Sequence, residues 1–169
     1  MKRILILGSA GAGKSTLARR LAELLKLEVI HLDRHWWQPG WVPMAKEAWQ
    51  EKVREFAARQ SWIIDGNYLP TLPERLAAAD TVIFLDFPRL LCLWRVCKRR
   101  FVYRRKTRAD LAPGCPEKLD WEFILWIWRF PQATKPKILK LLETTEAECG
   151  IYILRSPKEV AGFVANFSS

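Results

Sequence analysis

The sequence has 169 residues, of which 50% are hydrophobic, so it is long enough to bury one core and short for two. Lys and Arg number 28 against 18 Asp and Glu, and the formal net charge of +10 favours anionic partners such as phosphates or nucleic acid. No apolar run is long enough for a bilayer span or an export signal, and no C-x-x-C pair is present. We therefore expect a single cytoplasmic domain, 1–169, that makes no membrane contact.

A glycine-rich motif at 8–16, GSAGAGKST, fits G-x-x-x-x-G-K-[ST] and directly follows an apolar run at 4–7. Glycines at this spacing let the backbone turn sharply and aim its N–H groups at a pyrophosphate. Lys14 is then expected to reach the β and γ phosphates and Ser15 to ligate Mg²⁺. The motif predicts ATP and Mg²⁺ as cofactors, because the guanine-specific N-K-x-D motif is absent from the sequence. The expected cofactor-binding residues of the motif are Gly8, Gly11, Ala12, Gly13, Lys14, Ser15 and Thr16.

The rest of the chain alternates strands and helices, as in an α/β protein. Apolar periodicity predicts strands at 3–7, 28–32, 61–65, 81–86 and 151–154. Helices are expected at 14–26, 44–59, 71–79, 89–104, 117–130 and 136–147, and after a capping box at 156–159. Pro131 and Pro136 are expected to bracket a turn. Strand–helix–strand units of this kind form parallel sheets that bind ligands at the carboxyl ends of their strands.

Acidic residues end or directly follow three of the predicted strands: Asp33, Asp65 and Asp86. Their placement puts them on the ligand side of the sheet, although each could instead cap the turn or helix that follows it. Asp33 is a candidate to orient an acceptor hydroxyl or to accept its proton. His31 and His35 stand four residues apart, but we expect packed histidines there and not a metal pair, because no acid or thiol shares the spacing.

Two further segments have unusual compositions. Residues 34–43 are rich in Trp, Pro and Gly, which predicts an irregular loop over the pocket, where Trp36, Trp37 and Trp41 could line the acceptor site. Residues 95–108 contain eight Lys or Arg and no acid. Such a run is either a solvated helix face or a phosphate-binding segment, and the nearby phosphate motif favours the second.

With these motifs in place, the chain resembles the nucleoside-monophosphate kinase and shikimate kinase group of P-loop phosphotransferases. It is most similar to the adenylate-kinase-like subgroup called DNA topology modulation proteins (FlaR-related). The resemblance extends over nearly the whole chain and is carried by VIHLDRHWWQPGW, WIIDGNY, LCLWRVCKRR and GCPEKLDWEF.

This resemblance implies a three-layer α/β P-loop NTPase fold with a five-stranded parallel sheet of order 2-3-1-4-5. It also implies an acceptor-side insertion at about 34–60 and an Arg-rich helical lid at about 99–135. By position, Asp65 becomes the acid beside Mg²⁺, a role for which Asp86 competes. Arg95 becomes the arginine that packs on adenine, and Arg99 grips phosphate, joined by the lid residues Arg104 and Arg108.

The chain departs from adenylate kinases after its third strand, where Asn67-Tyr68-Leu69 replaces an arginine that holds the acceptor's phosphate. AMP is therefore not favoured as acceptor, and Asp33 is similar to the arrangement in shikimate and gluconate kinases, which phosphorylate a hydroxyl. We expect an ATP-dependent phosphotransferase that moves the γ-phosphate to a nucleoside, a nucleotide or another small hydroxyl compound. The alternative is a regulatory or nucleic-acid-binding P-loop protein without a small acceptor.

Overall fold

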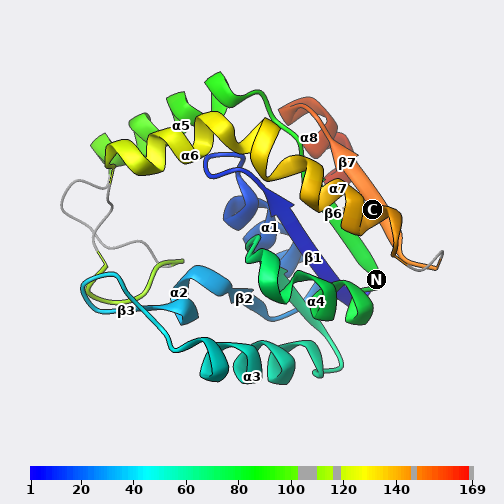
Figure 1. Ribbon diagram of the computed structural model, residues 1–169. Coiled ribbons are helices and arrows are strands. Elements are labelled where there is room, and N and C mark those ends of the chain that lie inside the picture. The colour runs from blue at the N-terminus through cyan, green and yellow to red at the C-terminus, as the bar shows by residue number, and fades with distance from the viewer. Residues whose placement is uncertain (103–109, 116–118, 146–147, 168–169) are drawn as a thin grey trace.

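The computed structural model describes residues 1–102, 110–115, 119–145 and 148–167 (Figure 1). Its centre is a parallel sheet of five strands in the order β2-β5-β1-β6-β7. In chain order these are the second, third, first, fourth and fifth strands of the sheet, so the expected order 2-3-1-4-5 is confirmed. The strands are β1 (Arg3–Gly8), β2 (Val29–His31), β5 (Trp62–Asp65), β6 (Thr81–Leu85) and β7 (Gly150–Leu154).

Helices cover both faces of this sheet, because alternate side chains of its strands point to opposite sides. Ile4 and Ile6 pack in a core with α1 (Lys14–Leu25), α5 (Arg89–Val102) and α8 (Pro157–Ala165). Leu5 and Leu7 belong to a second core with α3 (Lys46–Ala57), α4 (Leu72–Ala78) and α7 (Lys135–Glu143). The protein is thus a three-layer α/β domain, as expected, and none of its described helices has the length and apolar character to cross a bilayer.

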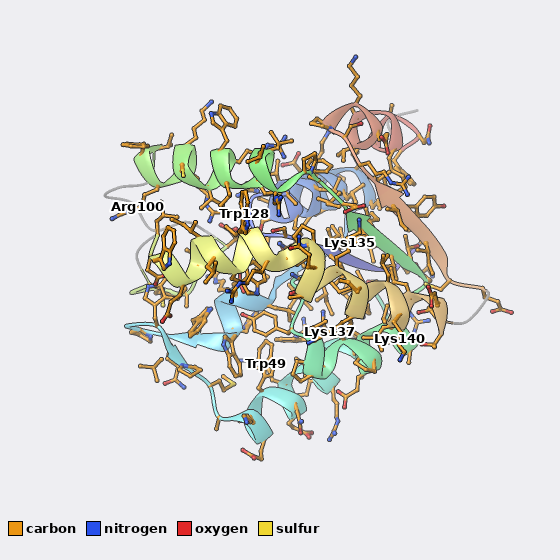
Figure 2. The ribbon with its side chains drawn as sticks, turned by 45° about the horizontal axis from the view of Figure 1, so that its top comes forward. Trp49, Arg100, Trp128, Lys135, Lys137 and Lys140 are labelled. Carbon is orange, nitrogen blue, oxygen red and sulfur yellow. The ribbon has the colours of Figure 1, made fainter. Side chains whose placement is uncertain are left out.

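Helix α6 (Trp121–Ala133) runs beside α5, and the two helices lie near the loop that follows β1 (Figure 1). Ile127 of α6 is buried in the first core and Phe130 in the second. The guanidinium of Arg89 lies 3.9 Å from the ring centroid of Trp128, at the junction of the two helices (Figure 2). These helices therefore help to enclose the edge of the sheet where ligands are expected.

The segment 34–43 is regular, so the expectation of an irregular loop was wrong. It continues α2 (Leu32–Trp36) into a hairpin of β3 (Trp37–Gln38) and β4 (Val42–Pro43). Pro39 and Gly40 occupy the central positions of a turn closed by the Trp41 N–H, which donates to the Gln38 carbonyl at 3.1 Å. Gly40 has φ 80°, the conformation that a proline–glycine turn of type II requires. The residues that suggested irregularity therefore form a tight turn.

Several element boundaries also differ from those expected. Strand β2 ends at His31, so Asp33 lies in the first turn of α2. Pro131 does not end α6 but lies within it, two residues before its end, where the missing N–H costs one hydrogen bond of the last turn. The capping box is confirmed, since Ser156 accepts from the Glu159 N–H at 3.2 Å and donates to its carboxylate at 3.0 Å. Between α4 and β5, a short 3-10 turn spans Leu69–Thr71.

Candidate active site

The loop from Gly8 to Gly13 connects β1 to α1 and has the close packing that its glycines predict. A Cβ atom at Gly11 would lie 2.3 Å from the Cys92 carbonyl oxygen of α5, and one at Gly8 would lie 2.7 Å from the Leu85 carbonyl oxygen of β6. Both glycines have positive φ, 143° for Gly8 and 79° for Gly11. Neighbouring backbone thus fixes the loop in one shape.

Lys14 extends back over this loop, where its Nζ donates to the carbonyls of Gly8 and Ser9, both at 3.0 Å. Burial lowers the pKa of Lys14, and the charges of Asp65 and Asp33 oppose that shift. The N-cap of α1 is Gly13, so no side chain caps its first turn, and no acid lies there. A phosphate would fit these residues, because a helix N-terminus supplies N–H donors and a positive dipole end.

A cavity of about 1140 Å³ opens in front of the loop. Its walls come from the segments that follow β1, β2 and β5, together with the hairpin and helices α5, α6 and α8. Gly8 packs beneath the loop and does not line the cavity, while Arg104 and Arg108 lie outside the described residues. The structure brings together in the cavity wall the other expected site residues: Gly11, Ala12, Gly13, Lys14, Ser15, Thr16, Asp33, Asp65, Arg95 and Arg99.

The two acids considered for Mg²⁺ have different surroundings. Asp65 lines the cavity, is 5% exposed, and its Oδ1 lies 2.8 Å from Nδ1 of His31. Asp86 instead accepts from Nζ of Lys135 at 2.6 Å and is not part of the cavity wall (Figure 2 labels Lys135). Among the described residues no cluster of three His, Cys, Asp or Glu forms a metal cage. Mg²⁺ is usually held by one or two protein groups and the phosphates, a role that Ser15 and Asp65 fit.

Asp33 points into the cavity and is held by Tyr68, whose hydroxyl donates to its Oδ1 at 2.6 Å. The surrounding protein raises the pKa of Asp33 by desolvation, while the bond from Tyr68 and the charge of Lys14 lower it. Burial and the adjacent carboxylate raise the pKa of Tyr68, so its hydroxyl stays protonated and remains the donor. This pair is a candidate for binding or deprotonating an acceptor hydroxyl.

The α5 arginines lie on the other side of the phosphate loop. Nη1 of Arg95 donates to the Ala12 carbonyl at 3.2 Å, and its guanidinium lies 5.2 Å from the ring centroid of Phe87. Arg99, one turn further along α5, also lines the cavity, and its charge contributes to the lowered pKa of Lys14. Both cations are thus close to the place expected for phosphates.

The tryptophans expected at the acceptor pocket divide into two groups. Trp37 and Trp41 line the cavity, with ring centroids 5.3 Å apart. Trp36 packs instead against Trp49 and Tyr68, at 5.2 and 5.8 Å between centroids, which places it in the second core. The hairpin therefore presents two indoles to the cavity.

Asn67 is a site residue that the sequence interpretation did not assign. Its Oδ1 accepts from the Gly8 N–H at 3.1 Å, and its Nδ2 donates to the Gly8 carbonyl at 2.9 Å. This one amide satisfies both backbone groups of the residue at which the phosphate loop begins. The strand order could have predicted this contact, because it places the segment after Asp65 directly beside the phosphate loop.

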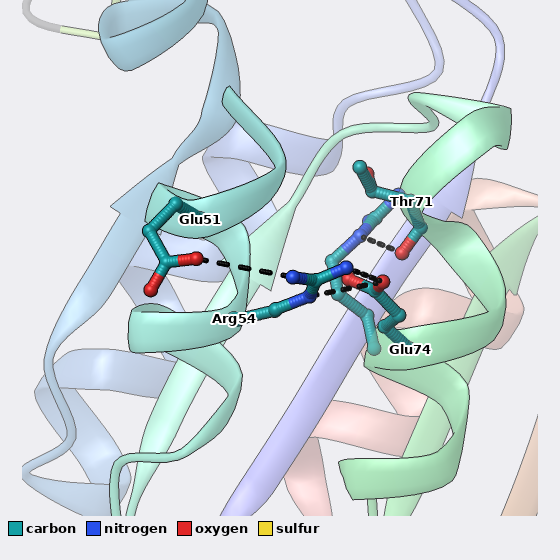
Figure 3. Close-up of polar contacts among 5 residues, drawn as sticks. Glu51, Arg54, Thr71 and Glu74 are labelled. Atoms are coloured by element: carbon teal, nitrogen blue, oxygen red, sulfur yellow. Dashed lines mark hydrogen bonds and ion pairs between the residues drawn. The ribbon is translucent and has the colours of Figure 1, made fainter. Parts of the chain in front are cut away.

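Arg75 of α4 holds the same segment by hydrogen bonds to its backbone. No feature of the sequence indicated this role. Arg75 is 0% exposed and donates to the carbonyls of Gly66 at 2.9 Å, Tyr68 at 3.0 Å and Thr71 at 3.2 Å, and also to that of Asn67. Figure 3 shows the bond at the Thr71 carbonyl. Burial lowers the pKa of Arg75 to about 9, so it keeps its charge at neutral pH.

Among the comparisons with known proteins, the one with solved structures gives matches. No family model matches the sequence, and no curated protein matches it. Among solved structures, the chain is similar to a shikimate kinase from Acinetobacter baumannii in complex with shikimate, with a TM-score of 0.64, 18% identity, and coverage of 99% of this chain and 91% of that one. It is also similar to a gluconokinase from Sinorhizobium meliloti, with a TM-score of 0.52, 16% identity, and coverage of 98% and 89%. A sugar kinase from Janibacter matches with a TM-score of 0.53, 15% identity, and coverage of 99% and 94%. The chain therefore has the fold of P-loop small-molecule kinases.

Proposed function

We propose that the protein is an ATP-dependent kinase that transfers the γ-phosphate of ATP to a hydroxyl of a small molecule. The observation that carries the proposal is that one cavity contains both the phosphate loop with Lys14 and, beyond it, the Asp33–Tyr68 pair. Direct phosphoryl transfer needs both substrates in one enclosed space with the reacting atoms aligned. The similarity to kinases of shikimate, gluconate and sugars supports the same reaction class.

In this proposal the residues of the phosphate loop and of α5 bind ATP and neutralise the negative charge of its phosphates. Lys14 and the N–H groups at the start of α1 bind the β and γ phosphates, Arg99 adds positive charge from the opposite side, and Arg95 packs on the adenine. Ser15 and Asp65 would hold Mg²⁺, which supplies further neutralisation of the phosphates when bound. Asp33 orients the acceptor hydroxyl or accepts its proton, and Arg104 and Arg108 of the lid join the phosphates. An arginine in such a position contributes on the order of 10³ to 10⁵ in rate.

The proposal also covers the cellular location, the subgroup and the domain organisation of the protein. A cytoplasmic location would supply ATP and keep the four free cysteines reduced. The resemblance to the topology modulation subgroup is part of the same proposal, as is the single-domain organisation with an insertion at about 34–60 and a lid at about 99–135.

The test is ADP release from Mg²⁺-ATP in the presence of a panel of nucleosides, nucleotides, sugars and hydroxy acids. We expect one group of acceptors to stimulate release at least tenfold, and Lys14→Ala to abolish the stimulation. ATP binding without stimulation by any acceptor would contradict the proposal. It would instead favour the regulatory or nucleic-acid-binding alternative, which steeply salt-dependent DNA binding would then support.

The magnesium assignment is tested by a matched pair of variants. Asp65→Asn should raise the Mg²⁺ concentration needed for half-maximal activity, whereas Asp86→Asn should leave it unchanged, because Asp86 pairs with Lys135 outside the cavity. The assignment fails if Asp86→Asn gives the larger increase.

A further inference from the structure

His31 lies beside Asp65 at the carboxyl ends of two neighbouring strands. His31 is the last residue of β2 and Asp65 is the last residue of β5, and the parallel pairing of these strands puts the two residues in register. Nδ1 of His31 lies 2.8 Å from Oδ1 of Asp65. An ionised carboxylate only accepts hydrogen bonds, so Nδ1 is the donor. The sequence favoured packed histidines at 31 and 35 and did not indicate this bond.

Both side chains point toward helix α1. Ile64, which precedes Asp65, packs in the second core, on the opposite side of the sheet from α1. Successive residues of a strand face opposite sides, and residues in register on neighbouring strands face the same side, so Asp65 and His31 face α1. That helix begins with Lys14 and Ser15. The charge of Asp65 accordingly raises the pKa of Lys14, against the larger effect of burial.

His31 takes up one oxygen of Asp65 and leaves the other one. Within the part of the chain that the structure describes, Oδ2 has no hydrogen-bond partner, yet it is not one of the fully buried orphan atoms. Since Asp65 lines the cavity, Oδ2 is the oxygen that remains for a ligand there. The last torsion of an aspartate side chain is broad and roughly two-fold, and a hydrogen bond to one oxygen removes this freedom. His31 thus determines how the carboxylate is turned.

The other acid considered for Mg²⁺ has a different kind of partner. Asp86 accepts from the ammonium of Lys135 at 2.6 Å, so a full positive charge already lies on its carboxylate. Asp65 is held by a single ring N–H and keeps an oxygen for the cavity. Hydrogen-bond partners of this second kind orient carboxylates that bind metals, and their loss weakens metal binding.

The second histidine of the chain has an environment of packing alone. The ring centroid of His35 lies 4.8 Å from that of Phe56, at an interplanar angle of 54°. His35 lies in α2, and it is not among the described residues of the cavity wall. It therefore serves as the matched control for His31.

On the basis of the proposed magnesium assignment, we propose that His31 is a positioning residue for Mg²⁺, whose Nδ1–H holds Asp65 in the orientation that receives the metal. His31 is not itself among the described residues of the cavity wall, so it acts through Asp65. The assignment of Ser15 and Asp65 is thereby extended to a third residue, which supports the metal without binding it.

The test measures how strongly Mg²⁺ improves the binding of a non-hydrolysable ATP analogue to the full chain, and it needs no acceptor. Calorimetry gives the dissociation constant of the analogue in EDTA and in saturating Mg²⁺, and we call the quotient of the two the magnesium coupling ratio. His31→Leu keeps a side chain of similar size without a donor. We expect it to lower this ratio about tenfold, since the loss of such a partner costs about 10–100-fold in metal affinity. Its affinity in EDTA should stay that of the wild type, because the phosphate loop is unchanged.

His31→Asn separates hydrogen bonding from packing. Asparagine carries an N–H donor at the same number of bonds from the backbone as Nδ1 but has no ring. A positioning role predicts that His31→Asn keeps the wild-type ratio while His31→Leu loses it, whereas a packing role predicts that leucine is tolerated better. If His31→Leu does not fold, as urea unfolding would show, His31→Asn decides alone, and a lowered ratio in that variant overturns the proposal. His35→Leu should keep the wild-type ratio, and a loss equal to that of His31→Leu would also overturn it.

Asp65→Asn distinguishes failure of this inference from failure of the magnesium assignment. It should lower the ratio at least as much as His31→Leu, because it alters the proposed ligand itself. If Asp65→Asn lowers the ratio and His31→Leu does not, the inference is overturned and the magnesium assignment stands. If Asp65→Asn keeps the wild-type ratio, the magnesium assignment fails and the inference fails with it. The kinase function is decided separately, by the acceptor panel.

Discussion

Replacing Arg75 with methionine should destabilise the fold far more than its position on a short helix suggests. The carbonyls of Gly66 and Asn67 have Arg75 as their partner, whereas the Tyr68 carbonyl also accepts from the Thr71 N–H and Oγ1 at 3.0 and 3.1 Å. Leaving a buried acceptor without its donor costs about 1–3 kcal/mol, so two orphaned carbonyls give a loss of about 2–6 kcal/mol. The assay is urea unfolding, read as the change in the free energy of unfolding.

Arg54 on the neighbouring helix α3 provides the matched control (Figure 3). Its side chain is 59% exposed and pairs with Glu74 at 3.3 Å and with Glu51 at 3.8 Å. Exposed pairs of this kind contribute about 0–1 kcal/mol, so Arg54→Met should fall in that range. An Arg75→Met variant that is no less stable than Arg54→Met would refute the reasoning, because it would show that the carbonyls find water or other partners.

Three further substitutions test individual contacts. Gly11→Ala should abolish ATP binding in calorimetry, because the added Cβ would lie 2.3 Å from the Cys92 carbonyl oxygen. Wild-type affinity would show that α5 can move away from the loop at little energetic cost. Asn67→Ala should weaken ATP binding by freeing both backbone groups of Gly8, and an unchanged dissociation constant would exclude a role in shaping the loop. Ser156→Ala removes an N-cap and should cost about 0.5–2 kcal/mol in urea unfolding, with ATP affinity unchanged as the internal control.

The sequence was most informative where a single local rule decides the structure. The buried strands, the glycine loop and the Ser156 capping box each follow from short-range patterns, and the structure contains all of them. The strand order came from a family resemblance and is likewise present. Periodicity and turn chemistry work here because burial or backbone geometry leaves few alternatives for such segments.

The differences arise where tertiary context decides. The Pro and Gly content of 34–43 suggested an irregular loop, but Pro39 and Gly40 form a tight turn, and whether the residues on either side pair as strands depends on contacts with α2 and with Gly114. Pro131 is tolerated in α6 because it lies within the last turn of that helix. In the sequence, Arg75 cannot be distinguished from an exposed arginine on a helix. Its acceptors are backbone carbonyls, which every residue has, so no side chain in the sequence indicates these hydrogen bonds. Patterns of apolar residues cannot report such bonds.

The strand order explains why one short loop can serve both ends of the cavity. Strand β5 lies between β1 and β2, so the residues that follow it emerge between the phosphate loop and α2. Asn67 therefore reaches Gly8 on one side, and Tyr68 reaches Asp33 on the other. Because Arg75 donates to the carbonyls of both residues, one buried side chain helps to set the spacing between the phosphate loop and the Asp33–Tyr68 pair.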